Sequence, residues 1–285
     1  MTDAQQWVEE NMGGMLTRYP IRRLLYEEQT PFQRMRLIES EPYGRMLLLD
    51  DYVQLTEKDE FVYHEMMTHV PMLAHGNPRH VLVIGGGDGG ILREVCKHPG
   101  VEHVTLAEID GRVIEFSKAH LPSVSNGAFD DPRVEICVGD GAAFVKNTTE
   151  KYDVVIVDSS DPVGPAQVLF SKEFYTDIRN ALAPGGVMVR QTGSTFLQPD
   201  EQKQAMEILS GVFEHAALYL FNVPTYVGGL FSCVFASDTL NALTTTVETL
   251  QERAAATKLA GRYYSPKIHV AAFELPGYVR ENIAR

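Results

Sequence analysis

The feature that most constrains the fold is a regular alternation of apolar runs and helical segments between residues 80 and 237. Runs such as "HVLVIGGG" and "YDVVIVDS" are apolar almost throughout, as expected of strands that are buried on both faces of a sheet. Segments such as "GILREVCKH" and "RVIEFSKAHL" follow them and have helical character. This order predicts an α/β fold: a Rossmann-like, doubly wound, mostly parallel sheet with helices on both faces.

The chain before this alternation has a different texture. Short runs such as "MRLIES" and "RMLLLDDYVQLT" are separated by the turn-like segments "EQTP" and "EPYG", which predicts the hairpins of a small antiparallel sheet. The spacing of apolar residues from Asp59 to His75 predicts an amphipathic helix. We therefore expect an N-terminal β-hairpin domain over residues 1–57 and a Rossmann-like domain, which would carry any catalytic site, over residues 58–285.

Composition excludes several classes of protein. The net charge of -13 argues against a nucleic-acid binder, which needs a basic surface. No apolar run approaches the ~20 residues of a membrane span, and the N-terminus lacks the pattern of a signal peptide. The three cysteines are far apart, as in proteins of a reducing compartment. We expect a cytoplasmic protein without nucleic-acid or membrane partners.

The first strand of the alternation ends in a glycine-rich turn, "GGGDGG", in which Gly85, Gly87 and Gly90 fit the pattern G-x-G-x-x-G. Glycines there permit a tight turn and a close approach of a ligand to the backbone. Glu108 ends the second strand, 21 positions after Gly87, where an acid accepts hydrogen bonds from ribose hydroxyls. Together these features favour a nucleoside-type ligand and leave open whether it resembles NAD or S-adenosylmethionine.

Carboxylates mark four consecutive strand ends, namely Asp88, Glu108, Asp140 and the pair Asp158 and Asp161. Asp140 could equally cap the following helix, and the pair could cap a turn. No lysine or arginine lies in these turns, so a pyrophosphate would be repelled, whereas a sulfonium and an amine would be attracted. Asp88 would crowd the carboxylate of intact S-adenosylmethionine and would attract the same molecule after decarboxylation.

These motifs make a resemblance specific. The stretches "YHEMMTHVP", "VLVIGGGDGGILREV", "VTLAEID", "VGDG", "YDVVIVDSSDPVGPAQVLFSKEFY" and "PTYVGG" resemble the spermidine synthase family, the polyamine aminopropyltransferases, from about Gln33 to Tyr226. The resemblance implies a sheet like that of S-adenosylmethionine-dependent methyltransferases. It also implies transfer of an aminopropyl group from decarboxylated S-adenosylmethionine to a diamine, usually putrescine, which leaves 5′-methylthioadenosine. The donor would be a co-substrate, and no cofactor or metal is implied. The family generally forms dimers or tetramers, so we expect a homodimer or homotetramer.

The resemblance also assigns roles to individual residues. Asp88 would bind the aminopropyl amine, Glu108 the ribose, and Asp140 with Gly141 the adenine. The complete set of donor-binding candidates is Gln33, Gly85, Asp88, Glu108, Asp140 and Gly141. The candidates for the amine acceptor are Asp161, Tyr63, His64, Tyr226 and Gln54, with His64 standing where many family members have glutamine.

Asp158 is the candidate general base. The acceptor ammonium must lose a proton before its nitrogen can attack, and a free aspartate at ~3.9 lies about 6.5 pKa units below an ammonium at ~10.4. Burial and a neighbouring acid raise the pKa of a carboxylate, so a closed pocket would narrow this gap. Asp161 would anchor the amine. The sequence leaves open whether Tyr63 or water shares the proton transfer, and whether the acceptor is putrescine, cadaverine, spermidine or agmatine.

Other readings are weaker. The segment "HEMMTH" places His64 and His69 five positions apart, on different helix faces, so it does not predict zinc binding. An S-adenosylmethionine-dependent N-methyltransferase acting on a polyamine would share the sheet, but Asp88 disfavours a donor that keeps its carboxylate. A non-catalytic polyamine-binding protein would be expected to lack one of the strand-end acids, and all are present.

Overall fold

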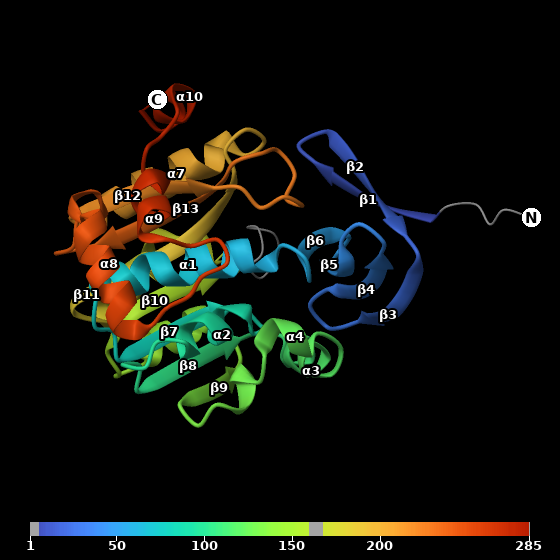
Figure 1. Ribbon diagram of the computed structural model, residues 1–285, viewed down its shortest axis with the longest axis horizontal. Coiled ribbons are helices and arrows are strands. Elements are labelled where there is room, and N and C mark those ends of the chain that lie inside the picture. Colours follow the sequence, from blue (N-terminus) through green and yellow to red (C-terminus); the bar gives the residue numbers. More distant parts are fainter. Residues whose placement is uncertain (1–5, 160–167, 285) are drawn as a thin grey trace, which may run out of the picture.

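The computed structural model describes residues 6–159 and 168–284. The described N-terminal part of the chain is built only of antiparallel strands (Figure 1). A hairpin and a four-stranded sheet lie side by side. The strands of the hairpin are β1 (Gln6–Met12) and β2 (Met15–Ile21), and those of the sheet are β3 (Arg23–Gln29), β4 (Arg34–Ser40), β5 (Gly44–Leu49) and β6 (Tyr52–Thr56). The hairpins predicted from the sequence are present. Strand β1 was not predicted, although the turn Gly13–Gly14, with both φ angles positive, is a typical hairpin signal.

A seven-stranded sheet forms the rest of the core, in the order β12-β13-β11-β10-β7-β8-β9. Its strands are β7 (His80–Gly85), β8 (His103–Glu108), β9 (Val134–Val138), β10 (Tyr152–Asp158), β11 (Leu182–Ser194), β12 (His215–Phe221) and β13 (Phe231–Ser237). Only β13 runs antiparallel to its neighbours, β11 and β12. Apart from β13, which is inserted between β11 and β12, chain order runs outward from β7 in both directions. The strand order therefore reverses between β7 and β10, where ligands of doubly wound sheets bind.

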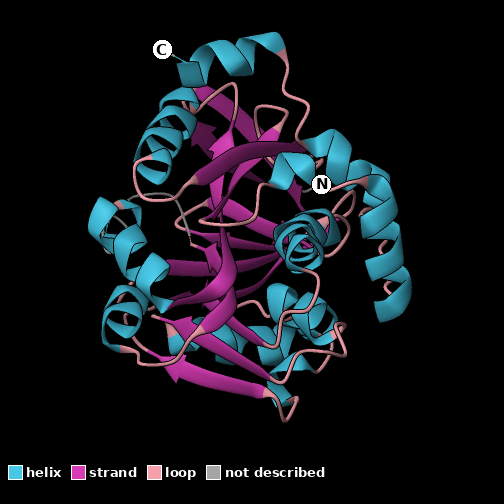
Figure 2. Ribbon diagram, turned by 90° about the vertical axis from the view of Figure 1, so that its left-hand side faces the viewer, coloured by secondary structure: helices cyan, strands magenta, loops and turns pink. Residues whose placement is uncertain are grey.

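Helices cover both faces of this sheet, which Figure 2 shows edge-on between two layers of helices. One face packs against α1 (Glu60–His75), α2 (Gly90–Cys96), α8 (Val247–Thr257) and α9 (Pro266–Ala272). The other packs against α5 (Gly141–Asn147), α6 (Lys172–Ala181), α7 (Pro199–Ser210) and α10 (Gly277–Ala284). Alternate residues of one strand enter opposite cores, Val81 and Val83 on the first face and Leu82 and Ile84 on the second. This arrangement confirms the predicted doubly wound, mostly parallel fold.

The N-terminal sheet docks onto helices that follow β8. Met35, Leu37 and Leu47 of the sheet share a buried apolar cluster with α3 (Gly111–His120) and α4 (Pro122–Ser125). Single turns of 3-10 helix lie at Ala128–Asp130 and Ala242–Thr244. Docking at α3 and α4 places the N-terminal sheet beside the carboxyl ends of the central strands (Figure 1).

One sequence expectation needs correction. Helix α1 is present, but it is not amphipathic: of its 16 residues only Phe61 and His75 are not buried, because the sheet, α2, α8 and residues 262–264 surround it. Helix α6 ends at Ala181, because Pro184 cannot continue a helix, and the chain enters β11 directly. None of the described helices has the length and the apolar character that crossing a bilayer requires.

Candidate active site

Charged side chains from three strand ends and one helix meet at the point where the strand order reverses. Strands β7, β8 and β10 lead into Asp88, Glu108 and Asp158, and the first turn of α1 supplies Tyr63 and His64. Ligand atoms of His64, Asp88 and Asp158 lie within 4.8 Å of one another. The structure thus brings together Asp88 and Asp158, which are 70 positions apart in the sequence.

Asp158 ends β10 in an environment that opposes ionisation. Burial and the nearby Asp88 carboxylate raise the pKa of Asp158 to about 6, although His64 and Tyr63 act in the other direction. The Tyr63 hydroxyl donates a hydrogen bond of 2.6 Å to Oδ1 of Asp158. Gly85 has a φ of 79°, and a Cβ there would lie 2.0 Å from the Asp158 carbonyl oxygen, so the turn after β7 requires glycine. A carboxylate with this pKa is mostly ionised at neutral pH and can still accept a proton.

His64 lies between two carboxylates. Its Nδ1 is 2.5 Å from Oε2 of Glu60, and its Nε2 is 3.3 Å from Oδ1 of Asp88. Burial alone would lower the pKa of His64, but these two carboxylates raise it to about 10. Although burial raises the pKa of Asp88, the His64 imidazolium lowers it overall. Because a doubly protonated ring has no lone pair, His64 is unsuited to bind a metal ion despite its position in the cluster.

Glu108, at the end of β8, is held by the backbone. Its Oε2 accepts a hydrogen bond from the Gly87 N–H and its Oε1 one from the Asp110 N–H. Burial raises the pKa of Glu108 to about 7. Gln33, from the N-terminal sheet, does not contact Glu108 directly; its amide donates to Oδ2 of Asp110 at 3.1 Å. Asp110 therefore links the N-terminal sheet to the site.

An aromatic wall lies beside Asp158, and it joins residues that are distant in sequence. The Tyr63 ring contacts those of Tyr226 and Phe231, with centroid distances of 5.8 and 5.7 Å. The Tyr226 hydroxyl donates to the backbone carbonyl oxygen of Gln54 at 2.6 Å. The Gln54 amide itself turns to the Tyr52 carbonyl, so this residue joins the wall through its backbone. Rings of this kind suit the methylene chain of an alkyl amine, while the acid beside them suits its charge.

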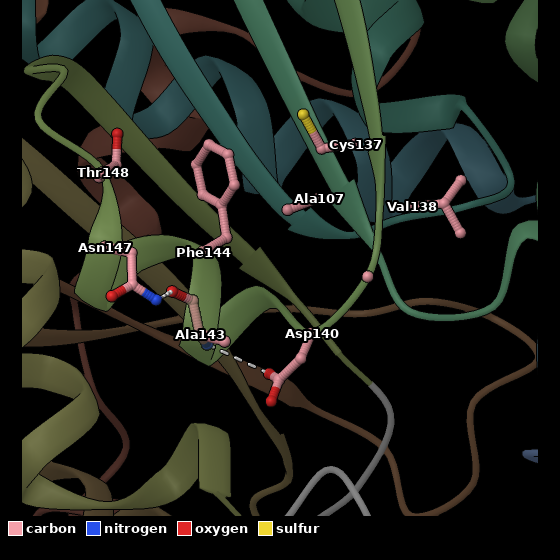
Figure 3. A pocket seen from close by; sticks show the side chains of 9 residues that line it. Ala107, Cys137, Val138, Asp140, Ala143, Phe144, Asn147 and Thr148 are labelled. Atoms are coloured by element: carbon pink, nitrogen blue, oxygen red, sulfur yellow. Dashed lines mark hydrogen bonds between the residues drawn. The ribbon is translucent and has the colours of Figure 1, made fainter.

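Asp140 and Gly141 lie one strand further along the sheet edge. Asp140 caps α5 by accepting a hydrogen bond of 2.8 Å from the Ala142 N–H, and it is exposed. It also borders a pocket of about 450 Å³ between β9 and α5, which Phe144 and Cys137 line (Figure 3). Gly141 packs against Ile84 of β7. Asp88, Glu108 and Asp158 do not line this pocket, and Asp140 is the strand-end acid that borders it in the described part of the chain.

Two groups of residues complete the comparison with the sequence. Asp161 lies outside the described residues. The residues that sequence reasoning missed are Glu60, Arg93, Asp110, Phe221 and Phe231, which contact the predicted ones. Glu60 stands four positions before His64 on the same helix, which was a readable signal, whereas nothing local pointed to the aromatic residues of β12 and β13.

Family models match almost the whole of the chain. Residues 60–246 match a model described as the spermine/spermidine synthase domain, and residues 6–57 match the spermidine synthase tetramerisation domain. A polyamine aminopropyltransferase from a Ruegeria species is 49% identical over 92% of this chain and 92% of its own length. Polyamine aminopropyltransferase 1 from Pseudomonas aeruginosa is 44% identical over 100% of this chain and 99% of its own.

Solved structures agree with the sequence matches. The crystal structure of a spermidine synthase in complex with the transition-state analogue AdoDATO has a TM-score of 0.92 and 38% sequence identity, covering 98% of this chain and 95% of that one. The spermidine synthase from Thermotoga maritima has a TM-score of 0.90 at 38% identity, covering 98% and 94%. The chain therefore belongs to the spermine/spermidine synthase family and is an enzyme of the polyamine aminopropyltransferase class.

Proposed function

We propose that the protein transfers the aminopropyl group of decarboxylated S-adenosylmethionine to putrescine, giving spermidine and 5′-methylthioadenosine, with Asp158 as general base. The observation that carries this proposal is the position of Asp158. Its carboxylate is mostly buried beside Asp88, bonded to Tyr63, and has a pKa raised to about 6. An acidic pocket with one perturbed carboxylate suits two cationic substrates, one of which must lose a proton.

The donor would lie across the ends of β7, β8 and β9. The free oxygen of Asp88 would bind its aminopropyl ammonium, and Glu108, held by two backbone N–H groups, would accept hydrogen bonds from the ribose. Asp140 and Gly141 would border the adenine. Gln33 would act through Asp110, and Gly85 would let the turn approach the donor. In this proposal the donor is a co-substrate and no cofactor takes part.

The acceptor would lie along the aromatic wall. Tyr63 and Tyr226 would flank its methylene chain, with Gln54 fixing the Tyr226 hydroxyl through its carbonyl oxygen. Asp158 would face the reacting nitrogen. His64 would place its positive charge next to the acceptor. Asp161 stays a prediction as the anchor of the amine.

The chemistry is an in-line displacement at the methylene group beside the sulfonium. Asp158 takes a proton from the acceptor ammonium, and the freed nitrogen lone pair forms the new C–N bond. The C–S bond breaks, and its electron pair neutralises the sulfonium as methylthioadenosine leaves. With Asp158 at about 6 and an ammonium at about 10.4, the proton-transfer gap is about 4 pKa units, or about 6 kcal/mol. This compares with roughly 9 kcal/mol for an exposed aspartate, and desolvation of the ammonium would narrow the gap further.

A mass assay of products tests this function. The protein is incubated with decarboxylated S-adenosylmethionine and, separately, with putrescine, cadaverine, agmatine and spermidine. We expect the amine to gain the mass of one aminopropyl group, and we expect the largest amount of this product with putrescine. Parallel incubations with intact S-adenosylmethionine test the alternative of an N-methyltransferase. A gain of one methyl group there, or no product with any amine, would refute the proposal; the second result would favour a polyamine-binding protein.

Assembly and location are separate proposals. We infer a homodimer or homotetramer formed through residues 6–57, on the strength of the tetramerisation model that matches them. Light scattering on the purified protein would test it, since a monomer at micromolar concentration would contradict it. The cytoplasmic location stays a prediction from the sequence.

A further inference from the structure

A chain of charged groups runs from Asp88 through His64 and Glu60 to Arg93. Asp88 pairs with His64, His64 with Glu60, and Glu60 with Arg93, whose Nη1 and Nη2 lie 2.9 and 2.8 Å from the two carboxylate oxygens. The side chains of His64 and Glu60 are 2% and 7% exposed, so water screens their interaction weakly. Nothing in the reaction proposed above uses Glu60 or Arg93.

The geometry of this chain fixes the protonation state of His64. Each ring nitrogen faces a carboxylate oxygen, and an ionised carboxylate only accepts hydrogen bonds. A neutral imidazole would place a bare lone pair against either Glu60 or Asp88, which would be repulsive. The ring also fills the space next to Gly90, where a Cβ would come within 2.2 Å of it. His64 is therefore held in place as an imidazolium.

The imidazolium in turn arranges Asp88. Oδ1 of Asp88 receives both the Gly90 N–H, at 2.6 Å, and His64 Nε2. Oδ2 has no hydrogen-bond partner in the described part of the chain, so it is the oxygen free to receive a cation. Asp158, the other acid in the cluster, would by itself favour protonation of Asp88 through repulsion, and the imidazolium offsets this effect.

Arg93 keeps the far end of the chain ionised. Its guanidinium binds both oxygens of Glu60 and also the carbonyl oxygen of Val124, which anchors it to α4. Glu60 therefore stays a carboxylate with a fixed orientation and can balance the charge on His64. Without Glu60, His64 would have only Asp88 and the more distant Asp158 to favour its charged form.

We propose that Glu60 and Arg93 are positioning residues which hold His64 as a fixed imidazolium, so that Asp88 presents an ionised carboxylate to the aminopropyl ammonium of the donor. This inference rests on the proposed function for the identity of that ammonium. It makes His64 part of the donor site through Asp88, in addition to lining the acceptor side.

A double-mutant cycle measures this relay. The affinity for decarboxylated S-adenosylmethionine is determined by calorimetry for wild type, Glu60→Gln, His64→Gln and the double variant. We expect each single variant to bind the donor about tenfold more weakly, and the double variant to lie within about twofold of His64→Gln, because Glu60 acts through His64. Additive losses in the double variant, or no loss in Glu60→Gln, would overturn the proposal.

Glu65→Gln provides the matched control. Glu65 lies on the same helix, is 1% exposed, and accepts hydrogen bonds from the backbone of Arg262, Tyr263 and Tyr264, away from His64. The same substitution there is expected to lower the melting temperature and to leave donor affinity within about twofold of wild type. A loss of donor affinity as large as that of Glu60→Gln would show that any buried charge on α1 has this effect, and would overturn the relay.

A second measurement needs no variant. Nitrogen NMR of histidine-labelled wild type at about pH 8 is expected to show both ring nitrogens of His64 protonated. The groups that face this ring are the carboxylates of Glu60, Asp88 and Asp158 and the neighbouring Tyr63, with Arg93 behind Glu60. A neutral ring would overturn the proposal. Product formation by wild type is followed in parallel. Its absence would count against the proposed function, whereas the donor-affinity cycle judges the relay alone.

Discussion

Two clusters on helix α1, an outer one around His64 and an inner one around His69, use the same residue types for different purposes. Five positions separate His64, which lies beside Asp88, from His69, which is 0% exposed and contacts Glu94 and His98. In the inner cluster, Glu94 also binds Lys97, so cations surround the Glu94 carboxylate and lower its pKa. Burial and His69 lower the pKa of His98 to about 3, which keeps that ring neutral. The inner cluster is charge-balanced.

The outer cluster, around His64, is not charge-balanced. In the described part of the chain, Asp88, Asp158 and Glu108 crowd one edge of the sheet with His64 as the nearest cation, and the pKa values of Asp158 and Glu108 are raised to about 6 and about 7. Ionised carboxylates in such a place are costly until a cation arrives. The comparison teaches that the charge surplus, rather than the presence of buried polar residues, distinguishes the proposed substrate site from a structural cluster.

Removing the proposed general base, Asp158, should have the largest effect. Asp158→Asn keeps the shape of the site and its bond from Tyr63, but it cannot take a proton. We expect turnover to fall by at least about 100-fold while donor affinity stays nearly unchanged. Single-turnover kinetics with saturating substrates would measure it, and turnover close to wild type would remove Asp158 from the role of base.

The same substitution should stabilise the ligand-free protein. The pKa of Asp158 is raised from 3.8 to about 6, so the folded state loses stability as the pH rises from about 4 to about 6, and the loss is complete above that range. About two pKa units correspond to about 3 kcal/mol as an upper limit. Asp158→Asn should gain up to that amount at about pH 8 and nothing below about pH 4. Urea unfolding at several pH values would measure this gain in stability. A gain that does not depend on pH would contradict a cost of ionising Asp158 in the folded state.

A matched pair of histidine substitutions compares the roles of the outer and inner clusters directly. His69→Gln removes a buried partner of Glu94 and should cost about 1–3 kcal/mol of stability, with kinetic constants of the folded enzyme unchanged. His64→Gln should alter donor affinity more than stability. Measuring both properties for both variants provides the check: equal kinetic losses would mean that the inner cluster also serves catalysis.

A smaller effect is expected at Asp140. Its carboxylate caps α5, so Asp140→Ala should lose about 1 kcal/mol of stability. If Asp140 also borders the adenine, donor affinity should fall as well, whereas Asp140→Ser should retain the cap and still bind the donor weakly. A Ser variant that binds the donor like wild type would reduce Asp140 to a cap.

Much of this fold was predictable because strand periodicity and glycine turns are local features. The strand-end rule located Asp88, Glu108 and Asp158 on one edge, and the structure brings Asp88 and Asp158 together. Glu60 was missed although its place four positions before His64 on the same helix is a readable signal. Arg93 was not predicted, since its contact with Glu60 joins α1 to α2 and no local pattern encodes it. Phe231 was missed for the same reason: it reaches Tyr63 only because β13 inserts beside β11.

The most direct test of the charge surplus is donor discrimination by Asp88. Calorimetry would give the affinities of wild type and Asp88→Asn for decarboxylated and for intact S-adenosylmethionine. We expect wild type to prefer the decarboxylated donor by about 100-fold or more, because a like charge at close range costs several kcal/mol. Asp88→Asn should reduce that preference to less than about tenfold. A preference that survives the substitution unchanged would contradict the account.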